Sequence, residues 1–127
     1  MIVLDACVLL ALTDKTNIFH ASARRVLSLP DQFAITALTG AEVMVYPMAV
    51  ADGGWPELLR DFAIDVVPIV AIDIAAIAAM RRQSGLKMPG ALVLWLAQRR
   101  DADVATFDDR LAAKARQFGL TVQPGED

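Results

Sequence analysis

The sequence contains almost none of the residues that build disulfide-linked or zinc-binding proteins. Its 127 residues include one cysteine, Cys7, and one histidine, His20. A single cysteine excludes a disulfide within the chain and a structural metal site made of cysteines. A single histidine argues equally against a zinc enzyme. The polar chemistry of the chain therefore rests mainly on its carboxylates.

Long apolar runs and a large net charge are also missing. No apolar run approaches the roughly 20 residues that span a bilayer, and the first residues lack the basic leader and the cleavage site of a signal peptide. We therefore expect a cytoplasmic protein with no membrane partner. The net charge of −3 gives no general attraction for polyanions, although a local basic patch can still face a nucleic acid.

Small and branched apolar residues dominate what the sequence does contain. Hydrophobic residues make up 56% of the chain and aromatic residues only 6%, a composition that suits buried parallel strands covered by Ala-rich helices. The length fits one domain with a full core. We predict a single domain over residues 1–123 and a frayed tail over residues 124–127.

Apolar segments alternate with helical patterns along the whole chain. Pro68 lies within the third apolar segment and places that strand at an edge of the sheet. Strands alternating with helices predict an α/β fold, a three-layer α/β/α sandwich around a mostly parallel sheet of about five strands. The predicted strands cover residues 2–4, 33–36, 66–70, 103–107 and 120–123. The predicted helices cover residues 7–12, 20–29, 39 onward, 57–63, 73–84 with Gly85 as the C-cap, 90–100 and 109–118.

Three acids stand near the ends of predicted strands. Asp5 follows the first strand, Asp108 follows the fourth, and Glu42 lies in the helix after the second. The carboxyl ends of parallel strands converge on one crevice, so these acids form a plausible site for Mg²⁺ or Mn²⁺, which take oxygen ligands. Such ions activate water and neutralise charge in phosphodiester cleavage.

Each acid also has a simpler structural interpretation. Asp5 is a good N-cap for the helix that follows it. Thr39 and Glu42 have the spacing of a capping box, in which Thr39 would be the N-cap. Asp73 is likewise placed to cap the Ala-rich helix after it. From spacing alone, capping and metal binding remain open alternatives.

Other chemistries of α/β proteins are not indicated. No glycine-rich phosphate loop follows the first strand, which argues against a dinucleotide fold and a nucleoside triphosphatase. A phosphatase of the Asp-x-Asp type would need an acid at Cys7. No serine has a partner histidine in a credible position, because His20 suits the start of a helix or a packing role better than that of a base.

Four segments of the chain form a recognisable series of motifs. They are Ile2-Val3-Leu4-Asp5, Leu38-Thr39-Gly40-Ala41-Glu42-Val43, Gly85-Leu86-Lys87-Met88-Pro89 and Asp103-Val104-Ala105-Thr106-Phe107-Asp108 with Ala112, Ala115, Gly119 and Leu120 after it. Together these segments resemble the PIN domain family, and more narrowly the VapC toxins of bacterial toxin–antitoxin pairs, over nearly the whole chain and in the order of the family's motifs. The resemblance implies a compact α/β/α nuclease fold, Mg²⁺-dependent endonucleolytic cleavage of RNA, a homodimer, and neutralisation by a VapB-type antitoxin.

The resemblance assigns the family's catalytic and metal-binding acids to positions of this chain. Asp5 matches the first acid, Glu42 the second and Asp108 the fourth, and Mg²⁺, with Mn²⁺ as a substitute, is the implied cofactor. The third acid should follow Pro89, where this chain has Gly90. Glycine offers no side-chain ligand, so the implied site lacks one of its four carboxylates.

The neighbouring residues depart from the family in smaller ways. The hydroxyl often found two residues after the first acid is replaced by Cys7, whereas Thr106 keeps a hydroxyl near the fourth acid. Asp109 is a further possible metal ligand, although a first-turn acid of the following helix is the more ordinary interpretation.

Because Mg²⁺ is often held by only one or two carboxylates and keeps several waters, a site with three acids can remain partly active. We hypothesise that Asp5 and Asp108 hold the ion directly and that Glu42 acts through a water. The leading function is a VapC-like endoribonuclease toxin. The alternative is a weakened or inactive PIN-fold protein that binds antitoxin or RNA without efficient cleavage.

Basic residues lie on either side of the acids in sequence. As a cluster they are predicted to contact the phosphates of RNA, while each taken singly is equally well explained as part of a solvated helix face. These residues are Arg81, Arg82, Lys87, Arg110 and Lys114.

Overall fold

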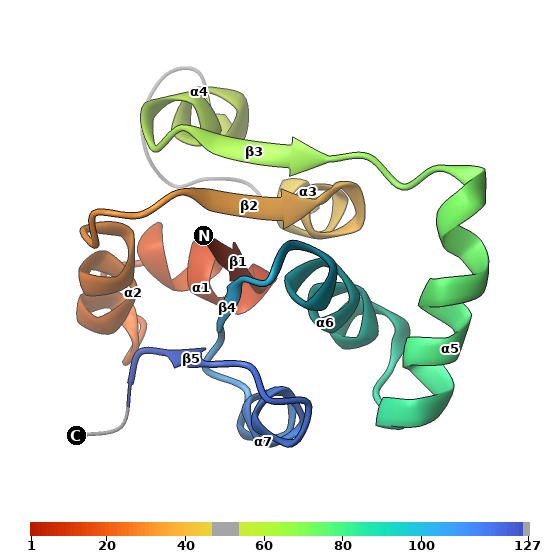
Figure 1. Cartoon of the computed structure of the whole chain (residues 1–127). Coiled ribbons are helices and arrows are strands. Elements are labelled where there is room, and N and C mark those ends of the chain that lie inside the picture. The colour runs from red at the N-terminus through yellow and green to blue at the C-terminus, as the bar shows by residue number, and fades with distance from the viewer. Residues whose placement is uncertain (47–53, 126–127) are drawn as a thin grey trace.

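The structure is a computed structural model that describes residues 1–46 and 54–125. Within these residues, strands and helices alternate as the sequence predicts (Figure 1). The strands are β1 (Ile2–Leu4), β2 (Phe33–Thr36), β3 (Ile64–Val67), β4 (Asp103–Ala105) and β5 (Val122–Gln123). The helices are α1 (Ala6–Leu12), α2 (His20–Leu27), α3 (Ala37–Met44), α4 (Gly54–Asp61), the short 3₁₀ helix η1 (Ala71–Asp73), α5 (Ile74–Ser84), α6 (Met88–Arg100) and α7 (Asp109–Gln117).

All strand pairs in the sheet are parallel, and the strand order is β3-β2-β1-β4-β5. Strand β1 is central, with Val3 paired to Ala34 of β2 on one side and to Val104 of β4 on the other. The chain leaves β1 toward β2 and later returns to β4 on the opposite side. The boundary between β1 and β4 is therefore the point at which the order of strands reverses, where open α/β sheets place their ligands.

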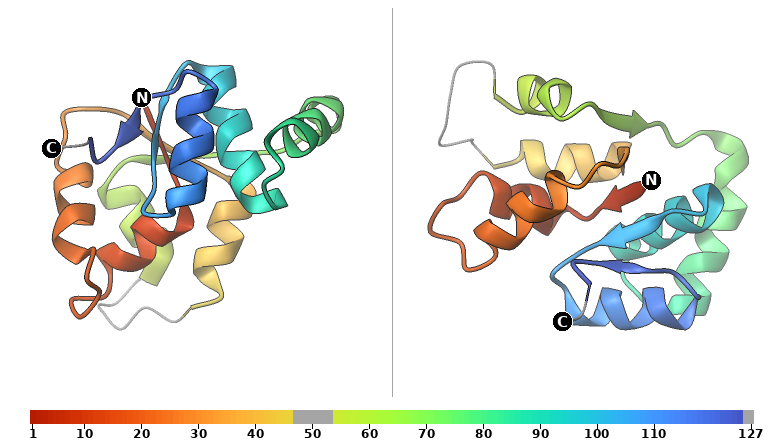
Figure 2. Two further views of the ribbon diagram at one scale, coloured as in Figure 1. Left: turned by 90° about the horizontal axis from the view of Figure 1, so that it is seen from below. Right: turned by 60° about the vertical axis from the view of Figure 1, so that its left-hand side comes forward.

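Helices cover both faces of this sheet, which confirms the three-layer prediction (Figures 1 and 2). Successive residues of β1 point to opposite faces. Ile2 and Leu4 join a core formed with α1, α2 and α4, whereas Val3 joins the core formed with α5, α6 and α7. Burial on both faces explains why β1 reads as an unbroken apolar run.

Several boundaries differ from the predictions. Strand β3 covers residues 64–67 instead of 66–70, so Pro68 follows the strand, and β3 does lie at an edge of the sheet. Strand β4 ends at Ala105, two residues earlier than predicted. By contrast, helix α5 ends at Ser84 with Gly85 as its C-cap, as predicted, and the φ of 69° at Gly85 is the left-handed conformation that glycine adopts without strain.

Of the two predicted caps in the middle of the chain, Thr39 is wrong, and Asp73 occupies the N-cap position of α5 without a side-chain capping bond. Helix α3 begins at Ala37, and its N-cap is Thr36, whose Oγ1 accepts a hydrogen bond from the Thr39 backbone N–H at 3.1 Å. Thr39 is therefore inside the helix, and Glu42 is not its capping-box partner. The side chain of Asp73 accepts from the backbone N–H of Val70, which precedes it, and makes no hydrogen bond to the start of α5.

Two further observations concern the ends and the environment of the chain. Strand β5 ends at Gln123, where the predicted domain ends, and residues 126–127 of the predicted tail lie outside the described part. In residues 1–46 and 54–125, none of the helices has the length and apolar character needed to span a bilayer.

Candidate active site

Asp5 follows β1 directly and performs two structural tasks at once. Its Oδ1 accepts the backbone N–H of Ala6 at 2.9 Å, so it is the N-cap of α1, as the simpler interpretation proposed. Its Oδ2 accepts hydrogen bonds from the Thr106 hydroxyl at 2.8 Å and the Cys7 thiol at 3.2 Å. These donors are all neutral, and within residues 1–46 and 54–125 this half-buried carboxylate forms no ion pair.

Thr106 connects the two aspartates that end β1 and β4. Its buried hydroxyl donates to Asp5 Oδ2 and accepts the backbone N–H of Asp108 at 3.0 Å. One side chain therefore sets both the orientation of Asp5 and the turn that carries Asp108. The hydroxyl near the fourth acid was noted from the sequence, but this bridge depends on the pairing of β1 with β4.

Cys7 supports the same network. Its Sγ donates to Asp5 and accepts the backbone N–H of Phe107 at 3.4 Å. Burial, followed by the charge of Asp5, raises the pKa of the Cys7 thiol to about 11. The thiol is therefore protonated at neutral pH and acts as a hydrogen-bond donor, which is the role a hydroxyl would have at this position.

Asp108 is the N-cap of α7. Its Oδ1 accepts the backbone N–H groups of Arg110 at 2.9 Å and Leu111 at 3.1 Å. Within the described part of the chain, its Oδ2 accepts no hydrogen bond. The side chain is exposed, so this oxygen is available to a ligand.

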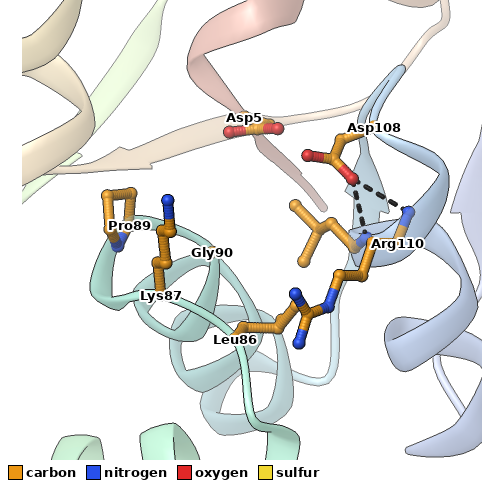
Figure 3. Close-up of a pocket in the computed structure, with 8 residues that line it drawn as sticks. Asp5, Leu86, Lys87, Pro89, Gly90, Asp108 and Arg110 are labelled. Atoms are coloured by element: carbon orange, nitrogen blue, oxygen red, sulfur yellow. Dashed lines mark hydrogen bonds between the residues drawn. The ribbon is translucent and has the colours of Figure 1, made fainter.

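Asp5 and Asp108 share a cleft of about 370 Å³. Figure 3 shows the two carboxylates on one side of this cleft and the beginning of α6, with Lys87 and Gly90, on the other. The Arg110 guanidinium reaches the cleft from α7, and its Nη2 donates to the backbone carbonyl of Gly85 at 3.0 Å. The lining is completed by Leu86, Pro89 and Leu111.

Glu42 lies near this cleft without lining it. The side chain is half-buried on α3, and among the described residues it has no hydrogen bond or ion pair. Desolvation and then the charge of Asp5 raise the pKa of the Glu42 carboxyl. Thr36 is the N-cap of α3, so Glu42 has no capping role, and the nearby Asp5 carries a charge of the same sign. Among the described residues, Glu42 therefore has no structural partner.

The three predicted acids do not form one closed ligand set. In residues 1–46 and 54–125, no three His, Cys, Asp or Glu side chains lie close enough together to hold a metal ion. Asp5 and Asp108 share the cleft, and Glu42 stands outside its lining. Asp109 is an exposed residue in the first turn of α7, as its simpler interpretation predicts, and it does not line the cleft.

Gly90 lies in the first turn of α6, facing the cleft. A Cβ at this position would meet Leu86 at 3.5 Å and Leu111 at 3.8 Å, which are ordinary van der Waals contacts. Neither space nor backbone conformation requires glycine here. The position implied to carry the third acid can therefore accept a side chain.

The predicted basic residues are spread along the cleft and beyond it. Lys87 and Arg110 line the cleft. Arg81 and Arg82 are exposed in the last turn of α5, and Lys114 lies one turn after Arg110 on α7, all three outside the lining. The structure thus places two of the five candidates beside the acids.

Comparison with known proteins identifies the family of this chain. Residues 2–117 match the model of the PIN domain family. The match covers most of the chain, so the protein belongs to the PIN domain family. Comparison with curated proteins gave no match.

Solved structures with the same fold include a toxin–antitoxin complex and a toxin. A toxin–antitoxin complex from Klebsiella pneumoniae aligns with 23% identity and a TM-score of 0.64, over 89% of this chain and 91% of that chain. FitAcB from Neisseria gonorrhoeae aligns with 19% identity and a TM-score of 0.62, over 96% of both chains. VapC20 of Mycobacterium tuberculosis, a sarcin-ricin loop cleaving toxin, aligns with 15% identity and a TM-score of 0.59, over 89% of this chain and 94% of that chain. At these identities the likeness establishes the fold.

Proposed function

We propose that this protein is a metal-dependent endoribonuclease of the VapC type, the toxin of a toxin–antitoxin pair. The observation that carries the proposal is the cleft that Asp5 and Asp108 share, where neither forms an ion pair with any described residue. Two further points support it. PIN domains are generally nucleases, and one protein of the same fold is a toxin that cleaves the sarcin-ricin loop.

The donor set of the cleft fits Mg²⁺ or Mn²⁺. Both ions take oxygen ligands, and Mg²⁺ is commonly held by one or two carboxylates with waters completing its coordination. Asp5 and Asp108 would be these carboxylates, while desolvation and then the charge of Asp5 raise the pKa of the neighbouring Glu42 carboxyl. When bound, such an ion lowers the pKa of water and neutralises charge on a phosphodiester.

The residues of the chain itself position the reaction. Thr106 fixes the orientation of Asp5, and the N-cap hydrogen bonds of Asp108 fix the aspartate on α7. Lys87 and Arg110 face the acids across the cleft, where they would hold the phosphate groups of RNA. Anchoring of Arg110 on the Gly85 carbonyl leaves its other N–H groups for that contact.

Gly90 supports a second function, binding of RNA or antitoxin without efficient cleavage. The absence of an acid in the first turn of α6 removes one carboxylate from the cleft and weakens the attraction for a divalent cation. The toxin–antitoxin complex of the same fold supports an antitoxin partner, which we propose to be of the VapB type. A homodimer and a cytoplasmic location belong to the same proposal.

Cleavage of a mixed RNA pool tests the proposal. The unchanged chain, Gly90→Asp and Asp5→Asn are compared with Mg²⁺, with Mn²⁺ and with a chelator. Metal-dependent cleavage by the unchanged chain, lowered more than about 100-fold in Asp5→Asn, is the expected result, since outer-shell changes alone cost 10- to 100-fold. If only Gly90→Asp cleaves RNA and the unchanged chain does not, the result would favour the binding function for the unchanged chain. Cleavage that survives in Asp5→Asn would contradict the site.

A further inference from the structure

Two phenylalanines form a stacked pair beside the cleft. The rings of Phe19 and Phe107 have centroids 4.5 Å apart and are tilted by only 5°. Phe107 directly precedes Asp108, so the pair lies one residue away from a cleft-lining acid. Neither aromatic residue stood out in the sequence, because they are 88 positions apart and belong to no common motif.

The two rings differ in what surrounds them. Phe107 is half-buried and packs against the core that contains α1 and α2, whereas Phe19 does not belong to that core and is 38% exposed. Phe19 therefore covers the outer side of Phe107 and presents its own outer side to solvent. Its neighbour Ile18 is 88% exposed.

The loop that carries Phe19 is held in place by its own side chains. Asn17 Oδ1 accepts the Phe19 backbone N–H at 2.8 Å, and Asp14 Oδ1 accepts both the backbone N–H and the hydroxyl of Thr16. These turns fix the position of the exposed ring before any ligand arrives. A platform that is already ordered loses little entropy on binding.

Exposed cations occur in this loop and in the helix after it. Lys15 lies in the loop with one acid, Asp14, and the exposed Arg24 and Arg25 lie in the last turn of α2. The acids of the cleft lie between this loop, on the side of α1 and α2, and the basic residues Lys87 and Arg110, on the side of α6 and α7. An RNA strand that crosses the cleft would meet cations on both sides of the acids, Lys15 on the loop side and Lys87 and Arg110 on the other.

We propose that Phe19, stacked on Phe107, is a platform for a nucleobase of single-stranded RNA that crosses the cleft. Single-stranded RNA is recognised largely by stacking of its unpaired bases on aromatic side chains. The pair would anchor the base next to the phosphodiester held near Asp5 and Asp108. This inference rests on the proposed function, and it adds the residue on which a base of the RNA would stack.

Binding of a fluorescein-labelled RNA decamer, measured by anisotropy in chelator so that no cleavage occurs, tests the platform. Phe19→Leu keeps an apolar side chain without a π-face and should weaken binding by about 5- to 150-fold, the range for one stacked base. Phe19→Trp should bind within about threefold of the unchanged chain, because it keeps the π-face. Ile18→Ala is the matched control for an exposed apolar neighbour and should bind normally.

A second RNA separates stacking from other losses. A decamer that lacks its bases but keeps its phosphates should bind the unchanged chain more weakly than the normal decamer does, and Phe19→Leu should show no such preference. Circular dichroism establishes that each variant is folded. Equal affinity of Phe19→Leu and the unchanged chain for the normal decamer would overturn the platform, as would equal losses with both RNAs.

The remaining outcomes distinguish the platform from the proposed function. RNA binding that depends on Phe19, without metal-dependent cleavage, would support the platform and count against the nuclease. Cleavage that is insensitive to Phe19 would do the reverse. No RNA binding by the unchanged chain, or a change in oligomeric state in Phe19→Leu with unchanged RNA binding, would overturn the platform, and the latter would assign this surface to a protein contact.

Discussion

Helix α6 has carboxylates near both of its ends, and the two groups differ in whether a cation is paired with them. Near its last turn, Asp73 is 5% exposed and accepts hydrogen bonds from Arg99 Nη1 at 2.9 Å and the Val70 backbone N–H at 3.0 Å. Arg99 also lies 5.5 Å above the Trp95 ring. Near the first turn, Asp5 and Asp108 have neutral donors only, and no ion pair forms with either in the described residues.

The difference separates a carboxylate that stabilises the fold from carboxylates that await a ligand. A buried charge is tolerated when a cation and hydrogen bonds compensate it. The cleft instead brings two carboxylates together, and desolvation followed by the charge of Asp5 raises the pKa of Glu42 nearby. An uncompensated set of this kind is typical of functional sites.

Addition of Mn²⁺ should give the largest change in the free energy of unfolding, because the ion binds in the cleft of Asp5 and Asp108. A ligand that binds only the folded state at about 100 times its Kd raises the free energy of unfolding by about 2.7 kcal/mol. Thermal unfolding with and without Mn²⁺ should show this rise for the unchanged chain and its loss in Asp5→Asn. Asp65→Asn, at an exposed acid on β3, is the control and should keep the rise. Equal stabilisation of Asp5→Asn and the unchanged chain by Mn²⁺ would show that the ion does not bind through Asp5, and the contrast between the two ends of α6 would be lost.

Removal of the Arg99 charge should destabilise the fold near the last turn of α6. Arg99→Met leaves Asp73 buried without its charged partner and should lower the free energy of unfolding by about 2 kcal/mol, less than for a fully buried pair because Arg99 is half exposed. Urea denaturation measures the loss. Arg100→Met is the matched control. Arg100 Nη1 lies 3.4 Å from Oδ2 of the exposed Asp65, so its loss should change the free energy of unfolding by less than about 1 kcal/mol. Equal losses in both variants would contradict the assignment.

Asp108 should show its structural and functional roles separately. Asp108→Ala removes the N-cap of α7 and should cost about 1 kcal/mol. Asp108→Asn keeps a good cap and should leave stability nearly unchanged, yet it should lose part of the stabilisation by Mn²⁺. Urea denaturation with and without the ion distinguishes the two. If both variants are destabilised equally, charge rather than capping is what α7 requires at this position.

The smallest expected effect concerns Glu42. Because its pKa is raised in the folded state, the folded protein holds this proton to higher pH than the unfolded chain, so stability falls as pH rises above the ordinary value of 4.5. Glu42→Gln should therefore be slightly more stable than the unchanged chain at pH 7, by less than the loss in Asp108→Ala, and equally stable below pH 4.5. Thermal unfolding at both pH values measures the difference. A less stable Glu42→Gln at pH 7 without metal would mean that Glu42 has a stabilising partner.

The fold was predictable because its local signals agree with one another. Apolar runs, helical patterns, the Gly85 helix end and the proline that opens α6 each indicate one structure, and parallel strands then bring Asp5 and Asp108 to one edge. Failures fell where two local signals competed. Thr36 and Thr39 are both good caps, and only the end of β2 decides that Thr36 is used.

Contacts between distant segments could not be predicted in this way. The hydrogen bond from Thr106 to Asp5 joins residues 101 positions apart and depends on the register that pairs Leu4 with Ala105. The stacking of Phe19 on Phe107 depends in addition on a loop conformation set by Asn17. Periodicity identifies strands and helices, but it does not specify which side chains of neighbouring elements meet.

The sequence by itself determined the alternation of strands and helices, the acids after β1 and β4, and the glycine in the first turn of α6. These features follow from residue order and from local hydrogen-bonding and packing preferences. Only the tertiary structure decided that Asp5 and Asp108 share a cleft lined by Lys87 and Arg110 while Glu42 stands outside it. That arrangement arises from strand register and helix packing, which are collective properties of the folded chain.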